Sequence, residues 1–83
     1  MKRYKNINGK SNVEMYSIGL DYIDVKFKGT LTIYEYSYAT CGKENVENMK
    51  LLAKKGGGLN SYIMKTSKIN IWKSNYLETV LKD

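Results

Sequence analysis

The sequence predicts a single α+β domain, in which a three-stranded antiparallel meander is followed by two or three short helices. Apolar and polar residues alternate between residues 11 and 38, as they do in half-buried strands, and apolar residues recur at helical spacing from Val46 onward. A chain of 83 residues buries too little surface to form two cores. We therefore expect one domain over residues 11–83, preceded by a basic N-terminal arm at residues 1–10.

Alternation predicts the strands one by one. The first expected strand, residues 11–20, alternates imperfectly, which indicates an irregularity near Ser17. The second is regular, and its apolar positions are Ile23, Val25 and Phe27. Gly29 then closes a hairpin into a third strand over residues 30–38. The polar residues 1–10 are expected to be an arm or a ragged first strand.

Helical spacing begins after the polar break at residues 40–45. The apolar positions of the first helix are Val46, Met49, Leu52 and Ala53. Asn45 or Thr40 is expected to cap its start, and the glycines at 56–58 are expected to end it. A second short helix is expected at 59–64, an extended segment at 69–72, and a terminal helix capped by Ser74 or Asn75.

Net charge points to acidic partners. The chain has 14 basic and 8 acidic residues, a net charge of +6 and a pI near 9.4, which favours nucleic acid, nucleotides or acidic protein surfaces. All but one of the basic residues are lysine, which suits electrostatic and sequence-tolerant contact more than base-specific readout. The alternative is that the lysines maintain solubility and reflect an AT-rich genome.

Several function classes have little support in this composition. Cys41 is the only cysteine and there is no histidine, so no disulfide, cysteine metal site or Cys–His nucleophile is expected. The acidic residues are scattered and suggest no acid–base pair. We expect a protein that is not an enzyme and that uses no metal or cofactor. Because no signal-peptide or membrane-spanning run is evident, we expect it to be cytoplasmic.

A column of tyrosines is the first candidate site. Strand alternation places Thr32, Tyr34, Tyr36 and Tyr38 on one face. Their rings could stack on nucleic-acid bases, or they could fill the core or a subunit interface, and we favour the second interpretation. The other face is expected to be apolar, formed by Ile23, Val25, Phe27, Leu31 and Ile33. Both faces would then be covered, one by a helix and one by another subunit.

The glycine bend is the second candidate, because glycines expose backbone N–H groups and the start of a helix attracts anions. Its expected binding residues are Lys54, Lys55, Gly56, Gly57, Gly58 and Asn60. The alternative is a purely structural helix-to-helix connection, in which the glycines only close the first helix. A wider positive surface could include lysines of the first helix and of the sheet, namely Lys50, Lys54, Lys55, Lys26 and Lys28. The alternative is that these lysines form a solvated surface that maintains solubility. Glu47 is expected to neutralise part of the charge of Lys50. Trp72 is expected to pack in the core or to anchor a partner.

Short motifs in a fixed order give the chain a resemblance to a family. They are Ser11-Asn12-Val13, Ile18-Gly19, the run from Val25 to Gly29, Tyr34-Glu35-Tyr36 and Gly58-Leu59-Asn60 before Ile63. In these residues, over about 11–65, the chain resembles the KTSC domain, a small bacterial and phage module also found at the C-terminus of some lysyl-tRNA synthetases. It departs from the family in its short first hairpin and in lacking a proline near residues 40–42. The resemblance implies an α+β module for which RNA binding has been suggested, without an enzymatic activity or an established site.

Together these observations predict a small binding module for RNA, other nucleic acid or a nucleotide-like anion. The alternative is a phage-encoded anti-defence inhibitor or sponge, a homo-oligomer that sequesters a host defence protein or its nucleotide signal. A third possibility is a module that binds only protein through the outer face of the sheet.

Overall fold

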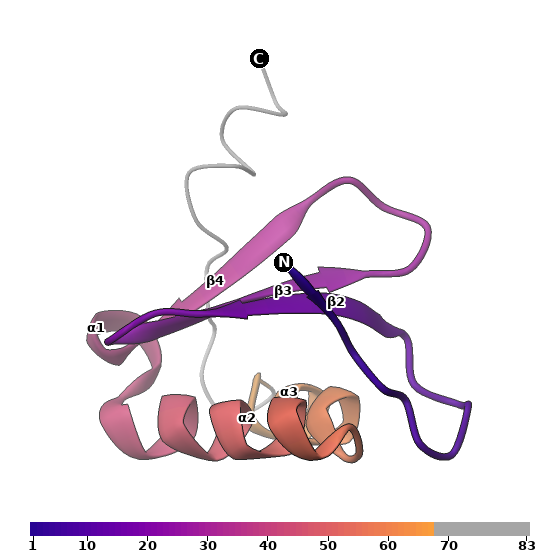
Figure 1. The fold of residues 1–83 in the computed structure, drawn as a ribbon. Coiled ribbons are helices and arrows are strands. Elements are labelled where there is room, and N and C mark those ends of the chain that lie inside the picture. Colours follow the sequence, from indigo (N-terminus) through magenta and orange to yellow (C-terminus); the bar gives the residue numbers. More distant parts are fainter. Residues whose placement is uncertain (68–83) are drawn as a thin grey trace.

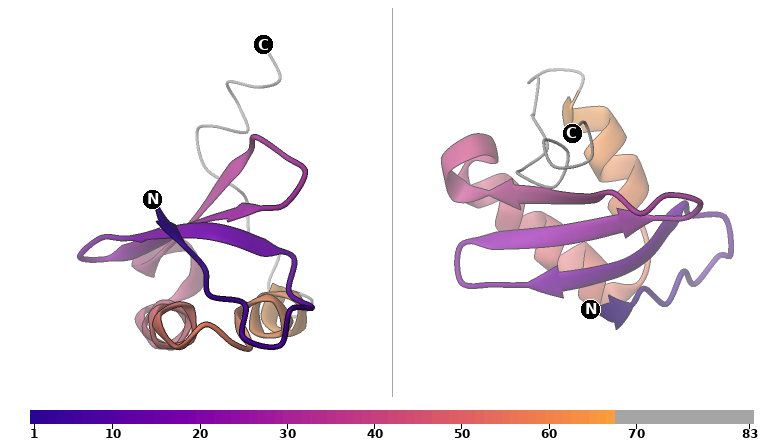
Figure 2. Two further views of the ribbon diagram at one scale, coloured as in Figure 1. Left: turned by 45° about the vertical axis from the view of Figure 1, so that its right-hand side comes forward. Right: turned by 90° about the horizontal axis from the view of Figure 1, so that it is seen from above.

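The computed structural model describes residues 1–67, which form one antiparallel sheet packed against helices. The strands are β1 (Lys2–Arg3), β2 (Val13–Ile18), β3 (Tyr22–Phe27) and β4 (Ile33–Ser37), in the spatial order β1-β2-β3-β4. The helices are α1 (Tyr38–Cys41), α2 (Lys43–Lys55) and α3 (Leu59–Ser67). Figure 1 shows α2 and α3 beneath one face of the sheet, and Figure 2 shows the two helices side by side in its left view and α2 running obliquely across that face in its right view. The α+β prediction is confirmed, and the expected segments at 69–72 and after Ser74 lie outside the described residues.

The sheet has four strands where a three-stranded meander was expected, because the start of the chain, predicted as an arm or a ragged first strand, forms the short strand β1. Lys2 lies opposite Tyr16 and Arg3 opposite Met15, and the N–H of Tyr4 donates to the carbonyl of Glu14 at 2.9 Å. Tyr4 is then only 3% exposed and belongs to the core. Backbone pairing of two exposed residues holds this strand, so no hydrophobic alternation marks it in the sequence.

Strand register places the tyrosines on the helix-covered face, which corrects the expected division of the sheet. Tyr34 lies opposite Val25 and Tyr36 opposite Ile23, and directly opposed residues in an antiparallel pair share a face. Two members of the expected apolar face are elsewhere. Leu31 is 84% exposed in the β3–β4 loop, and Ile33 lies opposite Lys26 on the outer face.

Local details of the strands also differ from expectation. The irregularity in β2 lies between Val13 and Met15, rather than near Ser17. Tyr38 has left the strand and begins α1, since the side chain of Ser37 accepts from the N–H of Thr40 and the Thr40 hydroxyl accepts from the N–H of Ser37. This reciprocal capping box satisfies two backbone donors at once and starts a helix where a polar break was expected.

The core lies between the sheet and the helices. Its members, all less than a tenth exposed, are Tyr4, Val13, Tyr16, Ile23, Val25, Tyr36, Cys41, Val46, Met49, Ala53, Leu59 and Ile63. Helix α2 contributes the positions that its spacing predicted, except that Leu52 is only half-buried. The first helical turn follows Gly42 without a side-chain cap, so neither Asn45 nor Thr40 caps α2.

Candidate functional site

The glycine bend connects α2 to α3, and its first glycine closes α2. Gly56 has a φ of +83°, and its N–H donates to the carbonyl of Leu52 at 2.9 Å, as in a left-handed helix cap. The carbonyl of Gly56 accepts from the N–H of Ile7 at 2.8 Å. Gly56 is therefore fully used inside the fold, as the helix-to-helix interpretation expected.

The second half of the bend borders a small polar cavity, which we call the corner cavity. Its volume is about 120 Å³, and it is lined by Asn8, Lys10, Ser11, Gly58, Asn60 and Ser61. Two distant segments meet here, the loop after β1 and the start of α3. The N–H of Leu59 donates to the hydroxyl of buried Tyr4 at 3.3 Å, which fixes the helix start against that loop.

The loop itself is shaped by asparagine side chains. Asn6, with a φ of +55°, accepts from the N–H of Ser11 at 2.9 Å and donates to its carbonyl at 3.3 Å. The side chain of Asn8 accepts from the N–H of Lys10 at 3.1 Å. These bonds hold Lys10 and Ser11 next to the helix start without using the ammonium group of Lys10.

Backbone donors at the start of α3 are free within residues 1–67. The first hydrogen bond of the helix runs from the N–H of Tyr62 to the carbonyl of Gly58, at 3.0 Å. The N–H groups of Asn60 and Ser61 precede that bond and have no acceptor among the described residues. Such groups carry partial positive charge and suit an anion.

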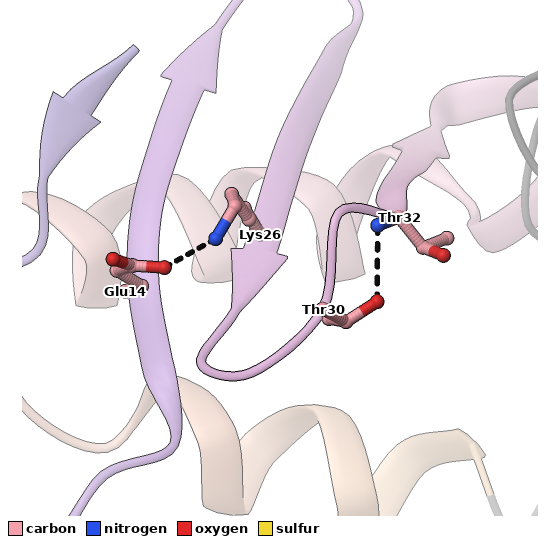
Figure 3. Close-up of polar contacts among 4 residues, drawn as sticks. All are labelled: Glu14, Lys26, Thr30 and Thr32. Carbon is pink, nitrogen blue, oxygen red and sulfur yellow. Dashed lines mark hydrogen bonds and ion pairs between the residues drawn. The ribbon is translucent and has the colours of Figure 1, made fainter.

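The expected lysines do not form one surface. Lys26 forms an ion pair with Glu14 across the outer face of the sheet (Figure 3), which engages its charge. Lys28 lies in the β3–β4 loop and has no ion-pair partner in the described part of the chain. In the same loop, the Thr30 hydroxyl accepts from the N–H of Thr32 at 3.0 Å (Figure 3). Lys54 and Lys55 are exposed, and Lys54 lines a different cavity.

Lys50 belongs to a structural network. Its side chain is buried, donates to the carbonyl of Leu20 at 2.9 Å and pairs with Glu47 at 2.8 Å. The hydroxyl of Tyr38 donates to the same carboxylate at 2.5 Å, and the Lys50 ammonium lies 5.4 Å from the Tyr38 ring centre. The hydrogen bonds that Glu47 accepts from Lys50 and Tyr38 lower the pKa of Glu47, and the hydrogen bond to the Glu47 carboxylate raises the pKa of Lys50. The predicted neutralisation of Lys50 by Glu47 is confirmed.

Base stacking on the tyrosine column does not fit the geometry. Tyr36 is 7% exposed, and burial raises the pKa of its hydroxyl. Tyr34 is half-buried and packs edge-on against Phe27, with ring centres 5.7 Å apart. The structure places both rings in or against the core, which is the interpretation that the sequence favoured.

A pair of carboxyl groups on the outer face was missed by the sequence reasoning, which found only scattered acidic residues. Asp24 on β3 lies directly opposite Glu35 on β4. Burial, reinforced by the adjacent Glu35 carboxyl, raises the pKa of Asp24 to about 7, and Asp24 Oδ1 has no hydrogen-bond partner within residues 1–67. The alternation of each strand could have placed both groups on one face; only the register brings them together.

The corner cavity includes two of the residues predicted for the glycine bend. Gly58 and Asn60 line it, whereas Lys54, Lys55, Gly56 and Gly57 do not. Lys10, Asn8, Ser11 and Ser61 were not singled out. The clustering of Asn6, Asn8 and Gly9 around Lys10 is a turn signal that could have drawn attention to this loop.

Within residues 1–67, no helix has the length and apolar character needed to cross a membrane, and no three acidic or cysteine side chains gather as metal ligands would. No protein-family model, curated protein or solved structure matches the chain.

Proposed function

We propose that this protein is a non-enzymatic binding module that holds phosphate groups of nucleic acid in the corner cavity. The observation that carries the proposal is that Lys10, Asn60 and Ser61 line one hollow, while the backbone N–H groups of Asn60 and Ser61 have no acceptor within residues 1–67. Helix N-terminal amides and a lysine together are a recurring arrangement for phosphate. The net charge of +6 supports the attraction of a polyanion.

Cavity size favours a phosphate group over a complete nucleotide. A volume of about 120 Å³ lies below the roughly 300–1,000 Å³ typical of small-molecule sites. A phosphate group needs less space than a base with its sugar, so the smaller group suits this cavity better. Recognition would then be sequence-tolerant, as expected of contacts made to the backbone.

Binding of a short single-stranded RNA, such as an eight-nucleotide oligouridine, tests the proposal. Fluorescence anisotropy across a salt series is expected to give an affinity that falls steeply with added salt. Lys10→Gln is expected to weaken binding about five-fold and to reduce the salt slope by about one.

Lys28→Gln is the matched control, because it removes the same charge from an exposed loop outside the cavity. It is expected to change the affinity by less than about two-fold. Equal losses for both variants would show that diffuse charge, and not the corner cavity, attracts the RNA. Absence of binding at low salt would remove the proposal.

A further inference from the structure

A second and larger hollow lies at the β1 edge of the sheet, and we call it the edge cavity. Its volume is about 410 Å³, and it is lined by Met1, Lys2, Tyr16, Ser17, Ile18 and Lys54. None of these residues lines the corner cavity. The volume falls within the roughly 300–1,000 Å³ typical of small-molecule sites.

Strand register explains how the edge cavity combines charge with an apolar wall. Lys2 on β1 lies opposite Tyr16 on β2, so these two residues share the face that α2 covers. Ile18 follows two residues later on the same face. Lys54 comes from the last turn of α2, which brings a second ammonium group to the hollow.

Polar groups of the edge cavity are not used inside the fold. Neither Lys2 nor Lys54 has an ion-pair partner among the described residues. Tyr16 is 8% exposed, and its hydroxyl has no hydrogen-bond partner within residues 1–67. The hydroxyl is not one of the fully buried polar atoms that lack a partner, so it is open to solvent. The lining of the edge cavity therefore offers a ligand three polar side chains, a hydroxyl and two ammonium groups, that make no hydrogen bond or ion pair within residues 1–67.

We propose that the edge cavity binds a small organic anion that carries both a phosphate-like group and an aromatic or apolar group, such as a mononucleotide. Lys2 and Lys54 contact the anionic group, and the Tyr16 hydroxyl donates a hydrogen bond to it. Ile18 and Met1 cover the apolar part. This site is independent of phosphate binding in the corner cavity, since the two share no lining residue.

Titration of the ¹⁵N-labelled protein with AMP, followed by NMR, tests the site. The amide signals of Lys2, Tyr16 and Lys54 are expected to shift together, while those of Asn60 and Ser61 stay in place. Adenosine and inorganic phosphate, which each retain one half of the ligand, are expected to bind at least about five-fold more weakly than AMP.

Two variants locate the contacts. Lys54→Gln and Tyr16→Phe are each expected to weaken AMP binding about five-fold. Tyr16→Phe removes a hydroxyl that has no partner, so it is expected to leave the fold intact. Lys55→Gln is the matched control, because the exposed neighbour lines neither cavity and is expected to change affinity less than about two-fold.

Three results would overturn the inference. These are no shifts at millimolar AMP, shifts confined to Asn60 and Ser61, or an equal effect of Lys54→Gln and Lys55→Gln. The second result would leave phosphate binding in the corner cavity standing, so that the two proposals fail separately.

Discussion

Lys50 and Lys10 carry the same charge in opposite surroundings. The ammonium group of Lys50 is buried and engaged by Glu47, by the carbonyl of Leu20 and by the ring of Tyr38. The ammonium group of Lys10 has no ion-pair partner in the described part of the chain, and it borders a hollow where backbone donors are also free. In a lysine-rich chain, the number of cations says little about binding, because the fold decides which of them are already satisfied.

Loss of the Lys50 network is the most damaging change we expect. Lys50→Ala removes a charged hydrogen bond to the Leu20 carbonyl and the ion pair with Glu47, and we expect a loss of about 2–3 kcal/mol in the free energy of unfolding. The half-exposed Glu47 recovers some hydration, which keeps the loss below that of a fully buried pair. Urea denaturation measures the effect. Lys10→Ala is the matched control and is expected to change stability by less than about 0.5 kcal/mol.

An equal loss for the two variants would contradict the comparison. The affinity for oligouridine is expected to fall more for Lys10→Ala than for Lys50→Ala, because folded Lys50→Ala protein keeps its corner cavity. Lys50→Ala should therefore have the larger effect on stability, and Lys10→Ala the larger effect on RNA binding.

The glycine bend offers a second contrast, between Gly56 and Gly57. Gly56 has a φ of +83°, and an added Cβ would lie 2.6 Å from the Cβ of Lys5. Gly56→Ala is therefore expected to cost about 1–2 kcal/mol, from backbone strain and displacement of the neighbouring segment. Thermal or urea unfolding measures the change.

Gly57→Ala is the control for that substitution. An added Cβ there meets only Ile7 Cδ1, at 3.9 Å, and we expect a change of less than about 0.5 kcal/mol. A large loss of stability for Gly57→Ala, or none for Gly56→Ala, would contradict the backbone conformation and the close approach of Lys5 described for this bend.

Features encoded in short stretches of sequence were predictable. Alternation in β3 marks Ile23 and Val25, which are fully buried, and helical spacing marks Val46 and Met49. Gly56 ends α2 as expected, because the left-handed cap is a local requirement. These predictions depend on neighbours within a few residues of one another.

Features that depend on pairing between distant segments were not predictable in the same way. Strand β1 is held by backbone hydrogen bonds of exposed residues, which leave no pattern. The tyrosines were expected on the face opposite Ile23 and Val25, whereas the register puts them on the same face. Alternation fixes which residues share a face within one strand, but not how neighbouring strands align. The corner cavity joins Lys10 to Ser61, and only the folded chain brings them together.

The Asp24–Glu35 pair should make stability depend on pH. In the folded protein the pKa of Asp24 is raised to about 7 from an ordinary value of 3.8, so the folded state holds a proton that the unfolded state has lost. Its favourable contribution is complete below pH 3.8 and is lost as the pH rises through about 7. Because the carboxyl is only partly buried, we expect the effect to be about 1 kcal/mol.

Asp24→Asn tests this dependence through urea denaturation at pH 4 and pH 7.5. The variant is expected to be more stable than the native sequence at pH 7.5 and about equal to it at pH 4. Glu35→Gln removes the facing charge and should reduce the same pH dependence. A native protein whose stability exceeds that of Asp24→Asn at pH 7.5 would contradict the assignment.

The ion pair between Lys26 and Glu14 should contribute least, although it resembles the Lys50–Glu47 pair in composition. Both side chains are partly exposed on the outer face of the sheet, at 21% and 35%, whereas the side chain of Lys50 is 10% exposed. Water solvates the separated charges well, so Glu14→Gln is expected to lower the free energy of unfolding only slightly, and by less than any of the destabilising substitutions discussed above. Lys26 lowers the pKa of Glu14, so this small contribution is present above the ordinary pKa of 4.5 and disappears in acid. A urea denaturation series in low and high salt measures it, and salt should abolish the difference between Glu14→Gln and the native sequence. If Glu14→Gln lowered the free energy of unfolding as much as Lys50→Ala does, the difference in burial between the two ion pairs would not explain how much each of them stabilises the fold.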